Sequence, residues 1–251
     1  MPRKMKESGV EWLGQIPEGW GLGRIGALYS LRNEKVSDKD FPPLSVTMKG
    51  IVPQLETAAK TDDGDNRKLV RKGDFAINSR SDRRGSCGIS AYDGSVSLIN
   101  TILTPRDTMS PAYYNWLFHT TSFADEFYKW GHGIVDDLWT TRWDDMKRIA
   151  IPTPPCSEQE RIAAFLDERC AKIDGMIAEA KAGIEDYKKW KQSLIEEVAL
   201  RGLESVPMVA VNSDWVEQVP AHWRFMQIRY LFELRDERNE KPLSEVNLIS
   251  L

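Results

Sequence analysis

The sequence has few cysteines and no long apolar run, and each shortage excludes a class of protein. Its three cysteines, Cys87, Cys156 and Cys170, are odd in number and far apart, so they indicate neither a disulfide framework nor a metal or redox spacing. No stretch approaches the ~18 apolar residues that a membrane span needs, and the first residues lack the apolar core of a signal peptide. We therefore expect reduced thiols, no membrane association and a cytoplasmic protein.

Signatures of catalysis are missing as well. The sequence contains no Walker-type phosphate loop, no Gly-x-Ser-x-Gly elbow and no Asn/Asp-Pro-Pro-Tyr motif of amino-group methylation. The three histidines have no ligand spacing, and the carboxylate pairs Asp136-Asp137 and Asp144-Asp145 are more typical of loops and helix caps than of an acid–base pair. We expect a protein that binds and does not catalyse, with no catalytic residue, no metal site and no cofactor.

A net charge of −4 argues against a generally basic nucleic-acid binder, but the charge is unevenly distributed. Between Asp65 and Gly85, seven basic residues stand against three acidic ones, a local excess of four. An acidic chain with one basic segment indicates a local patch with its own partner.

Residues 12–35 recur at 215–238 with a constant offset of 203. The positions that are identical in both copies begin with Trp12 and Trp215 and comprise Trp12, Gln15, Pro17, Trp20, Ile25, Leu28, Leu31, Arg32 and Glu34 in the first copy. The offset far exceeds the period of ~20–50 residues of a solenoid. The repeat therefore predicts a duplicated domain, of which the chain holds one copy and the opening of the next.

The first copy has the pattern of an α+β domain. Residues 44–110 contain short apolar runs separated by glycines, which predict strands at Leu44–Val46, Phe75–Ile77 and Ser97–Ile99. From Pro111 to Tyr128 the apolar and aromatic residues follow helical spacing, which is more typical of a packed core than of a base-stacking surface. Strands followed by helical sequence predict a mixed domain that ends near Pro152.

A long helix is predicted after this domain. Ser157 and Glu160 have the spacing of a capping box, and apolar residues then recur in heptads as far as about Leu200. Roughly 43 residues at ~1.5 Å each make a rod of ~65 Å. The side chains expected to pack against another helix include Leu166, Ile173, Ile177, Ile184 and Leu194. Because the sequence offers no second long helix, this stripe needs a partner.

A basic, glycine-containing loop at residues 78–86 follows one of the predicted strands. Arginine can form a fork with guanine or bind phosphates, and asparagine can pair with adenine. The candidate DNA contacts are Asn78, Ser79, Arg80, Arg83 and Arg84, with Lys49 and Gln54 as a neighbouring pair. A solvated surface loop is the alternative interpretation.

Three motifs resemble the specificity (S) subunit of type I restriction–modification systems. They are Ile16-Pro17-Glu18-Gly19-Trp20, then Arg71-Lys72-Gly73-Asp74-Phe75, and finally the segment from Ile151 to Ile162 with its IP-x-PP-x-x-EQ element, which is the most specific. The resemblance covers essentially the whole chain. It implies two target recognition domains, each followed by a long helix, with the helices packed antiparallel as a ruler between the halves of a split DNA site.

The resemblance implies an α+β fold with one mixed α/β target recognition domain at residues 1–154. A long coiled-coil spacer helix would follow at 155–202, and the beginning of a truncated second recognition domain at 203–251. The chain would read one half of a bipartite DNA target for a methyltransferase (M) subunit, which carries S-adenosylmethionine and methylates adenine. An ATP-driven restriction (R) subunit would join through the M subunit.

Two rival readings remain. In the first, the chain is a half-subunit, and two copies pair through the 157–200 helix to read a palindromic split site. In the second, the chain is a coiled-coil interaction or scaffold protein without a DNA role. A stand-alone nuclease or methyltransferase is the least favoured reading, because the sequence lacks a cofactor loop and a catalytic cluster.

Overall fold

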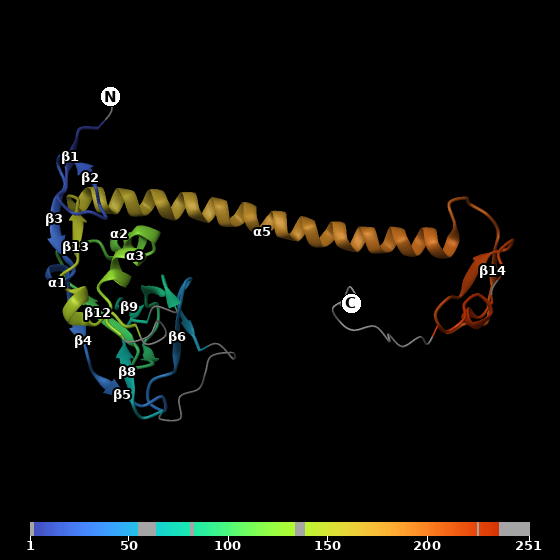
Figure 1. Ribbon diagram of the computed structural model, residues 1–251, viewed down its shortest axis with the longest axis horizontal. Coiled ribbons are helices and arrows are strands. Elements are labelled where there is room, and N and C mark those ends of the chain that lie inside the picture. The colour runs from blue at the N-terminus through green and yellow to red at the C-terminus, as the bar shows by residue number, and fades with distance from the viewer. Residues whose placement is uncertain (1–2, 55–63, 81–82, 134–138, 225, 236–251) are drawn as a thin grey trace, which may run out of the picture. The chain divides into compact units, whose positions relative to one another are not determined.

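The computed structural model describes residues 3–54, 64–80, 83–133, 139–224 and 226–235. The chain divides into two compact units, Met1–Ile173 and Asp174–Leu251 (Figure 1). Among the described residues, no helix is both long and apolar enough to cross a membrane.

The first unit begins with a short hairpin in which β1 (Met5–Glu7) pairs antiparallel with β2 (Gln15–Pro17). The next strand, β3 (Gly21–Arg24), pairs antiparallel with β13 (Ala150–Thr153), so the two ends of the domain's chain lie together. A one-turn helix, α1 (Ile25–Leu28), buries Ile25 completely and leads into the main sheet.

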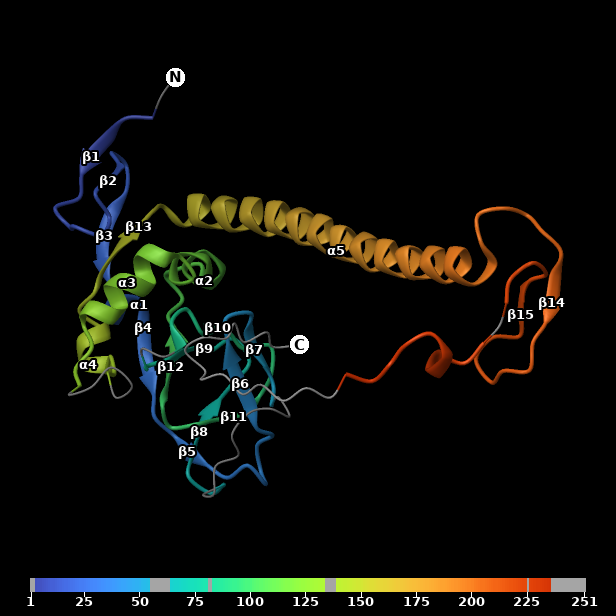
Figure 2. The ribbon, with the colours of Figure 1, turned by 45° about the vertical axis from the view of Figure 1, so that its right-hand side comes forward.

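Two antiparallel sheets and a hairpin form the strand-rich part of this unit (Figure 2). The four-stranded sheet has the order β10 (Cys87–Ile89), β9 (Phe75–Asn78), β12 (Asn100–Pro105) and β4 (Tyr29–Arg32). The three-stranded sheet has the order β11 (Gly94–Val96), β8 (Arg67–Val70) and β5 (Lys35–Val36). The hairpin of β6 (Leu44–Thr47) and β7 (Gly50–Pro53) packs against β10.

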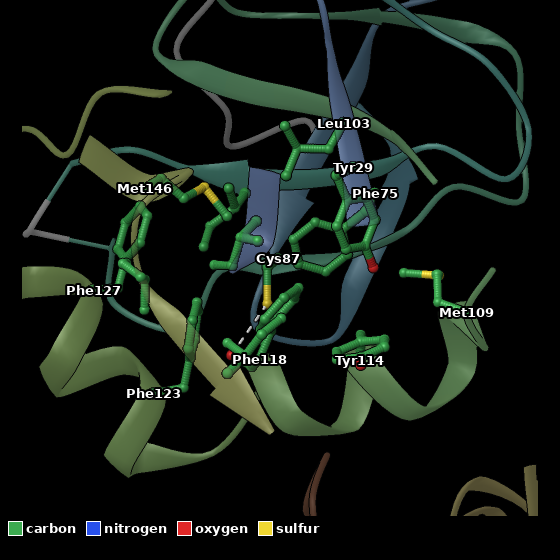
Figure 3. Close-up of a cluster of buried hydrophobic side chains, with 14 of the residues drawn as sticks. Tyr29, Phe75, Cys87, Leu103, Met109, Tyr114, Phe118, Phe123, Phe127 and Met146 are labelled. Atoms are coloured by element: carbon green, nitrogen blue, oxygen red, sulfur yellow. Dashed lines mark hydrogen bonds between the residues drawn. The ribbon is translucent and has the colours of Figure 1, made fainter. Parts of the chain in front are cut away.

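Three helices follow the sheets: α2 (Pro111–Phe118), α3 (Thr121–Lys129) and the short α4 (Trp143–Met146). Aromatic rings from α2 and α3 pack against the four-stranded sheet (Figure 3). The ring centroid of Phe118 lies 4.4 Å from that of Phe123 and 5.1 Å from that of Phe75. The aromatic stretch after Pro111 therefore builds a core, as its helical spacing predicted.

Two predicted boundaries are wrong. The apolar run Ser97–Ile99 is a turn and not a strand, because Asn100 donates both its backbone N–H and its side-chain amide to the carbonyl of Ser97. The helical stretch from Pro111 to Tyr128 consists of two helices and not one. Thr120 interrupts it and caps α3, since its hydroxyl accepts a hydrogen bond from the backbone N–H of Phe123.

The long helix α5 runs from Cys156 to Arg201, 46 residues, so its existence is confirmed but its predicted capping box is wrong. Because the helix begins at Cys156, Ser157 and Glu160 both lie inside it. The helix start is held by the two side chains between them. Glu158 accepts hydrogen bonds from Trp20 (3.0 Å) and Arg3 (2.8 Å), and Arg3 is the main reason that the pKa of Glu158 is lowered.

Gln159 forms the other half of this attachment and is 4% exposed. Its side-chain oxygen accepts the backbone N–H of Ser110 at 2.9 Å, and its amide nitrogen donates to the carbonyl of Pro154 at 2.8 Å. Adjacent residues of α5 therefore bind two different segments of the domain: Glu158 holds the N-terminal segment and Gln159 holds the residue before α2. The EQ pair of the IP-x-PP-x-x-EQ element has a structural role.

The Arg71-Lys72-Gly73-Asp74-Phe75 motif also has a structural role. Asp74 is 2% exposed, and its carboxylate accepts hydrogen bonds from Arg32 (2.6 Å), from the backbone N–H of Arg71 (2.8 Å) and from Thr104 (3.1 Å). The hydrogen bond with Asp74 raises the pKa of Arg32. The motif thereby joins β4, β12 and the turn before β9.

The second unit repeats the hairpin of the first at the same offset as the sequence. Strand β14 (Met208–Ala210) pairs with β15 (Gln218–Pro220), and Met208 faces Pro220 just as Met5 faces Pro17. The turn η3 (Ile228–Tyr230) begins at the position equivalent to the start of α1. The residues between β15 and η3 form no strand in the part that the structure describes.

Replacing Gln159 with alanine should destabilise the first unit by about 2 to 4 kcal/mol. The change leaves the N–H of Ser110 and the carbonyl of Pro154 without their partner, and each unsatisfied buried group costs roughly 1–3 kcal/mol. Urea unfolding followed by near-ultraviolet circular dichroism measures this loss. The matched control is Gln192→Ala, because Gln192 is exposed on the same helix and bonds only Glu196 among the contacts of the described residues. Equal effects of the two changes would contradict the structural role of Gln159.

Candidate nucleic-acid interface

The basic loop leaves the end of β9, where its first two residues turn inward. Asn78 and Ser79 are 5% and 6% exposed. The Asn78 side-chain oxygen accepts the backbone N–H of Arg80 at 3.0 Å, and the Ser79 hydroxyl shares a hydrogen bond of 2.8 Å with Thr101. These two predicted contact residues therefore support the loop in this conformation and do not present their side chains to solvent.

The segment around Thr140 holds the loop from the other side. Arg80 forms an isolated antiparallel bridge with Thr140, and the backbone N–H of Thr141 donates to the carbonyl of Ser79 at 2.9 Å. The Thr141 hydroxyl in turn donates to the carbonyl of Phe127 at 2.7 Å. These contacts attach the first part of the loop to the helical core. They fix the position of the Arg80 backbone.

The arginines that follow are exposed. Arg84 lies over the ring of Tyr128, with its guanidinium carbon 4.1 Å from the ring centroid, and it donates to Asp125 at 2.9 Å. Stacking and a carboxylate fix the plane of this guanidinium, although 47% of the side chain stays exposed. Arg83 is also exposed and belongs to the same turn, in which its carbonyl accepts the backbone N–H of Ser86.

A hollow lies beneath these arginines. It is lined by Arg80, Arg84 and Gly85 of the loop, by Tyr128 of α3 and by Trp139, which follows α3 in the chain. The rings of Tyr128 and Trp139 have centroids 5.7 Å apart, and the Trp139 indole donates to the carbonyl of Tyr128 at 2.9 Å. Arg84 above the ring of Tyr128, with Arg80 beside it, forms a surface suited to sugar, base or phosphate contacts.

The second predicted pair, Lys49 and Gln54, lies on the neighbouring β6–β7 hairpin. Lys49 is exposed in the turn of the hairpin, where its backbone N–H donates to the hydroxyl of Thr47 at 3.1 Å. A Cβ atom on Gly88 would come within 2.7 Å of the Cα of Gly50, so this turn lies directly against the strand that leaves the basic loop. Lys49 and the loop thus belong to one region, whereas Gln54 is partly buried at the far end of β7.

Several of the basic residues that produced the local charge excess have structural roles. Arg67 is 4% exposed and donates to the hydroxyl and the carbonyl of Ser95. Lys68 donates to the carbonyl of Asn100 at 2.7 Å, and its burial lowers its pKa. Arg71 pairs with Asp93 at 3.0 Å. Arg67 and Lys68 therefore add little to the outward-facing charge, which comes from Arg71 and Lys72 on one side and from Arg83 and Arg84 of the loop on the other.

Sequence reasoning missed two residues of this surface. Trp139 lines the hollow, and Arg142 is exposed directly after Thr141, which bonds the loop. Trp139 lies so close to Gly131 that a Cβ at that glycine would be 2.1 Å from the indole nitrogen. The Gly131-His132-Gly133 sequence was the only available signal, and it gave no indication of what would fill the space at Gly131.

Cys87 and His119 form a pair that resembles a nucleophile and its base, with the sulfur 3.7 Å and 3.8 Å from the two ring nitrogens. Cys87 is completely buried, and this burial raises the pKa of its thiol to about 12. A catalytic cysteine needs the opposite shift and an accessible sulfur. The pair is part of the core, where the thiol donates to the carbonyl of Phe118 (Figure 3).

The described residues contain no group of histidine, cysteine, aspartate or glutamate side chains that could hold a metal ion. The residues predicted to pack between helices are accessible on α5. Leu166 is partly buried, whereas Ile173, Ile177, Ile184 and Leu194 are between 44% and 54% exposed.

The arrangement of elements is similar to that of other solved structures, although the sequence matches no known family. No family model matches the sequence, and no curated protein sequence matches it. Among solved structures, the chain is similar to a chain from a structure that describes the basis of complex assembly and conformational transition of the type I R-M system. The TM-score is 0.56 at 18% identity, over 72% of this chain and 46% of that one.

The fold is that of a strand-rich domain followed by a long helix. It is shared with the HsdS subunit of Thermoanaerobacter tengcongensis, with a TM-score of 0.51 at 18% identity over 77% of this chain and 47% of that chain. This chain thus spans about half the length of the structures that it matches. The resemblance to type I specificity subunits and the expected mixed α/β architecture are confirmed at the level of the fold.

The buried Cys87 should resist thiol labelling in the folded protein. Because its pKa is raised to about 12, the thiol stays neutral near pH 8, roughly where a free thiol begins to ionise. A Cys156→Ser/Cys170→Ser variant should therefore react with a maleimide only after unfolding in urea. The wild-type chain is the control, since its exposed Cys156 should react at once. Rapid labelling of the folded double variant would show that Cys87 is accessible.

Proposed function

We propose that this chain is a DNA-binding specificity subunit of a type I restriction–modification complex and reads one half of a bipartite target. The fold shared with HsdS supports this role. The arginine-bearing loop beside an aromatic hollow supports DNA reading, and it is the observation that carries the proposal. The chain itself acts as a non-catalytic, cytoplasmic subunit.

Recognition on this surface combines two kinds of contact. Arg83 and Lys49 are exposed charges that neutralise phosphates and set affinity and register. Arg84 presents a guanidinium of fixed plane, which suits bidentate hydrogen bonds to a base edge such as guanine. Asn78 and Ser79 hold the loop from within, and Arg142 extends the basic surface.

The catalytic steps would be carried out by partner subunits. A methyltransferase (M) subunit would bring S-adenosylmethionine and methylate adenine, and a restriction (R) subunit would join through it and use ATP. The chain's share is to bind double-stranded DNA and to position these subunits on it. One of the similar solved structures concerns complex assembly of the type I R-M system, and this similarity supports such an association.

A coiled-coil interaction or scaffold protein without a DNA role is the second candidate. The observation in its favour is the exposed apolar surface of α5, which includes Tyr187 at 71% and Trp190 at 64% exposed. A scaffold of this kind would bind M subunits through the helix and would show no DNA affinity in their presence.

Replacing Arg80, Arg83 and Arg84 together with alanine should weaken DNA binding of the assembled complex. Each lost phosphate contact reduces the magnitude of the negative slope of log Kobs against log salt by about 0.9, so the slope should become less steep by up to about 3. Fluorescence anisotropy over a salt series measures it. The control replaces Lys4, Lys6 and Arg24, which are exposed basic residues on or beside β1 and β3. Unchanged affinity and target choice in the loop variant would show that the loop does not contact DNA.

Arg84→Lys separates the two kinds of contact. Lysine keeps the positive charge but loses the planar stack on Tyr128 and the forked donor geometry. We expect an almost unchanged salt slope together with a loss of about 1–3 kcal/mol of discrimination between target and non-target DNA. Competition binding with cognate and scrambled duplexes measures the discrimination. If Arg84→Lys discriminates as well as the wild-type chain, Arg84 contacts only phosphate or no DNA at all.

A further inference from the structure

The side chain of Arg84 is held at one nitrogen and on one face. Its Nη1 nitrogen donates to the Oδ1 oxygen of Asp125 at 2.9 Å, and its guanidinium lies over the ring of Tyr128, 4.1 Å from the centroid. The described residues make no hydrogen bond to its Nε or Nη2 nitrogen, and 47% of the side chain is exposed. Because a guanidinium carries five N–H donors, most of the donors of Arg84 can reach a ligand.

The two groups that hold this guanidinium come from one fixed helix. Asp125 and Tyr128 lie three residues apart on α3 and therefore on the same face. Phe123 and Phe127 anchor α3 in the core, where both side chains are buried. Tyr128 is supported in turn by Trp139, whose indole donates to the carbonyl of Tyr128 at 2.9 Å. The carboxylate and the ring therefore keep fixed positions and fix the guanidinium with them.

Asp125 has no second partner in the part of the chain that the structure describes. Its side chain is 54% exposed, and the contact with Arg84 is its only hydrogen bond there. A half-exposed ion pair of this kind contributes little to stability. A carboxylate on a surface that binds DNA also repels phosphates, so it lowers the affinity for DNA in general. Neither stability nor affinity explains its position.

We propose that Asp125 determines specificity by keeping phosphates away from Arg84 while leaving this arginine able to bind a base edge. The ion pair has no net charge, so a nearby phosphate is attracted by the guanidinium and repelled by the carboxylate. Asp125 does not touch DNA and acts through Arg84, as a positioning residue. The proposal rests on the proposed DNA-reading function and names a residue that gives it selectivity.

A base edge is affected differently from a phosphate. The edge of a guanine has no net charge, and its O6 and N7 atoms accept two hydrogen bonds from a guanidinium fork. The Nε and Nη2 nitrogens of Arg84 lie side by side on the guanidinium and are available for this fork. Asp125 thus weakens the sequence-independent contact of Arg84 and spares the sequence-dependent one, and a repulsive group of this kind raises specificity.

A second ion pair of the same kind provides a matched control. Arg71 pairs with Asp93 at 3.0 Å and lies over the ring of Phe41, 4.9 Å from the centroid. The two side chains of this pair are 44% and 52% exposed, almost as in the first pair. Arg71 precedes β9 and Arg84 follows it, so the two pairs lie at opposite ends of this strand.

The test compares Asp125→Asn with Asp93→Asn in the full-length chain, assembled with M subunits. Asparagine keeps an oxygen that can accept from the arginine but removes the charge, and both variants change the net charge equally. The wild-type complex first selects a target from a library of random duplexes, and scrambled duplexes of the same composition serve as non-target DNA. Fluorescence anisotropy over a salt series measures the affinity for both.

Asp125→Asn should bind scrambled DNA more tightly, because Arg84 then gains a phosphate contact. One added contact makes the salt slope steeper by about 0.9 and raises the affinity about threefold to tenfold at about 0.1 M salt. At the selected target Arg84 already binds a base, so the affinity and the slope should change much less. Discrimination therefore falls about threefold to tenfold, whereas Asp93→Asn should leave it unchanged.

Misfolding cannot produce this result, since a misfolded variant would lose affinity for both duplexes. Equal losses at both duplexes would mean that Asp125 only supports the loop, and this outcome overturns the proposal. A double-mutant cycle tests whether the effect passes through Arg84. In an Arg84→Ala background, Asp125→Asn should no longer change the discrimination, and an effect that persists there overturns the proposed route.

The failure of this proposal can be told apart from the failure of the DNA-reading role. A wild-type complex that selects no sequence overturns the reading role, and the role of Asp125 with it. If the wild-type complex selects a target and the Asp125→Asn complex discriminates equally well, only the role of Asp125 is overturned.

Discussion

The start of α5 is held by two adjacent side chains that bind different parts of the domain. Glu158 accepts from Trp20 near the chain's beginning, and Gln159 bonds both the residue before α2 and the proline before the helix. Strand β13 precedes this point and pairs with β3, so the sheet and the helix start constrain each other. The orientation of the first turns of α5 against the domain depends on these contacts.

The two copies of the repeat show how much burial depends on a covering element. Their hairpins have the same register, yet Ile25 is completely buried, whereas the equivalent Ile228 is 74% exposed. In the first copy, the backbone N–H of Ile25 donates to Ile149, and Gly26 packs so closely on Lys147 that a Cβ would be only 3.0 Å away. The second copy has Arg229 in the position of Gly26.

In the basic segment, the charge of a residue does not predict whether its side chain is buried or exposed. Its seven basic residues look alike as a sequence, but Arg67 and Lys68 support the sheet from within, and Arg71 pairs with Asp93 beside it. The candidate interface could therefore be predicted only as a segment. The positions of Arg80 and Arg84 depend on Thr140 and Tyr128, which lie much further along the chain and which hold the loop and orient Arg84.

The sequence by itself determined the features that rest on neighbouring residues: the repeat at a constant offset, the helical aromatic stretch after Pro111 and the long heptad helix. Such features arise from periodicity and short-range hydrogen bonds, which recur wherever the same residues do. The tertiary structure alone decided that Asn78 and Ser79 turn inward, that Trp139 joins the surface and that Glu158 and Gln159, in place of the predicted pair Ser157 and Glu160, hold the start of α5. These depend on partners far away in the chain, and no local pattern specifies which side chain a distant segment brings into contact.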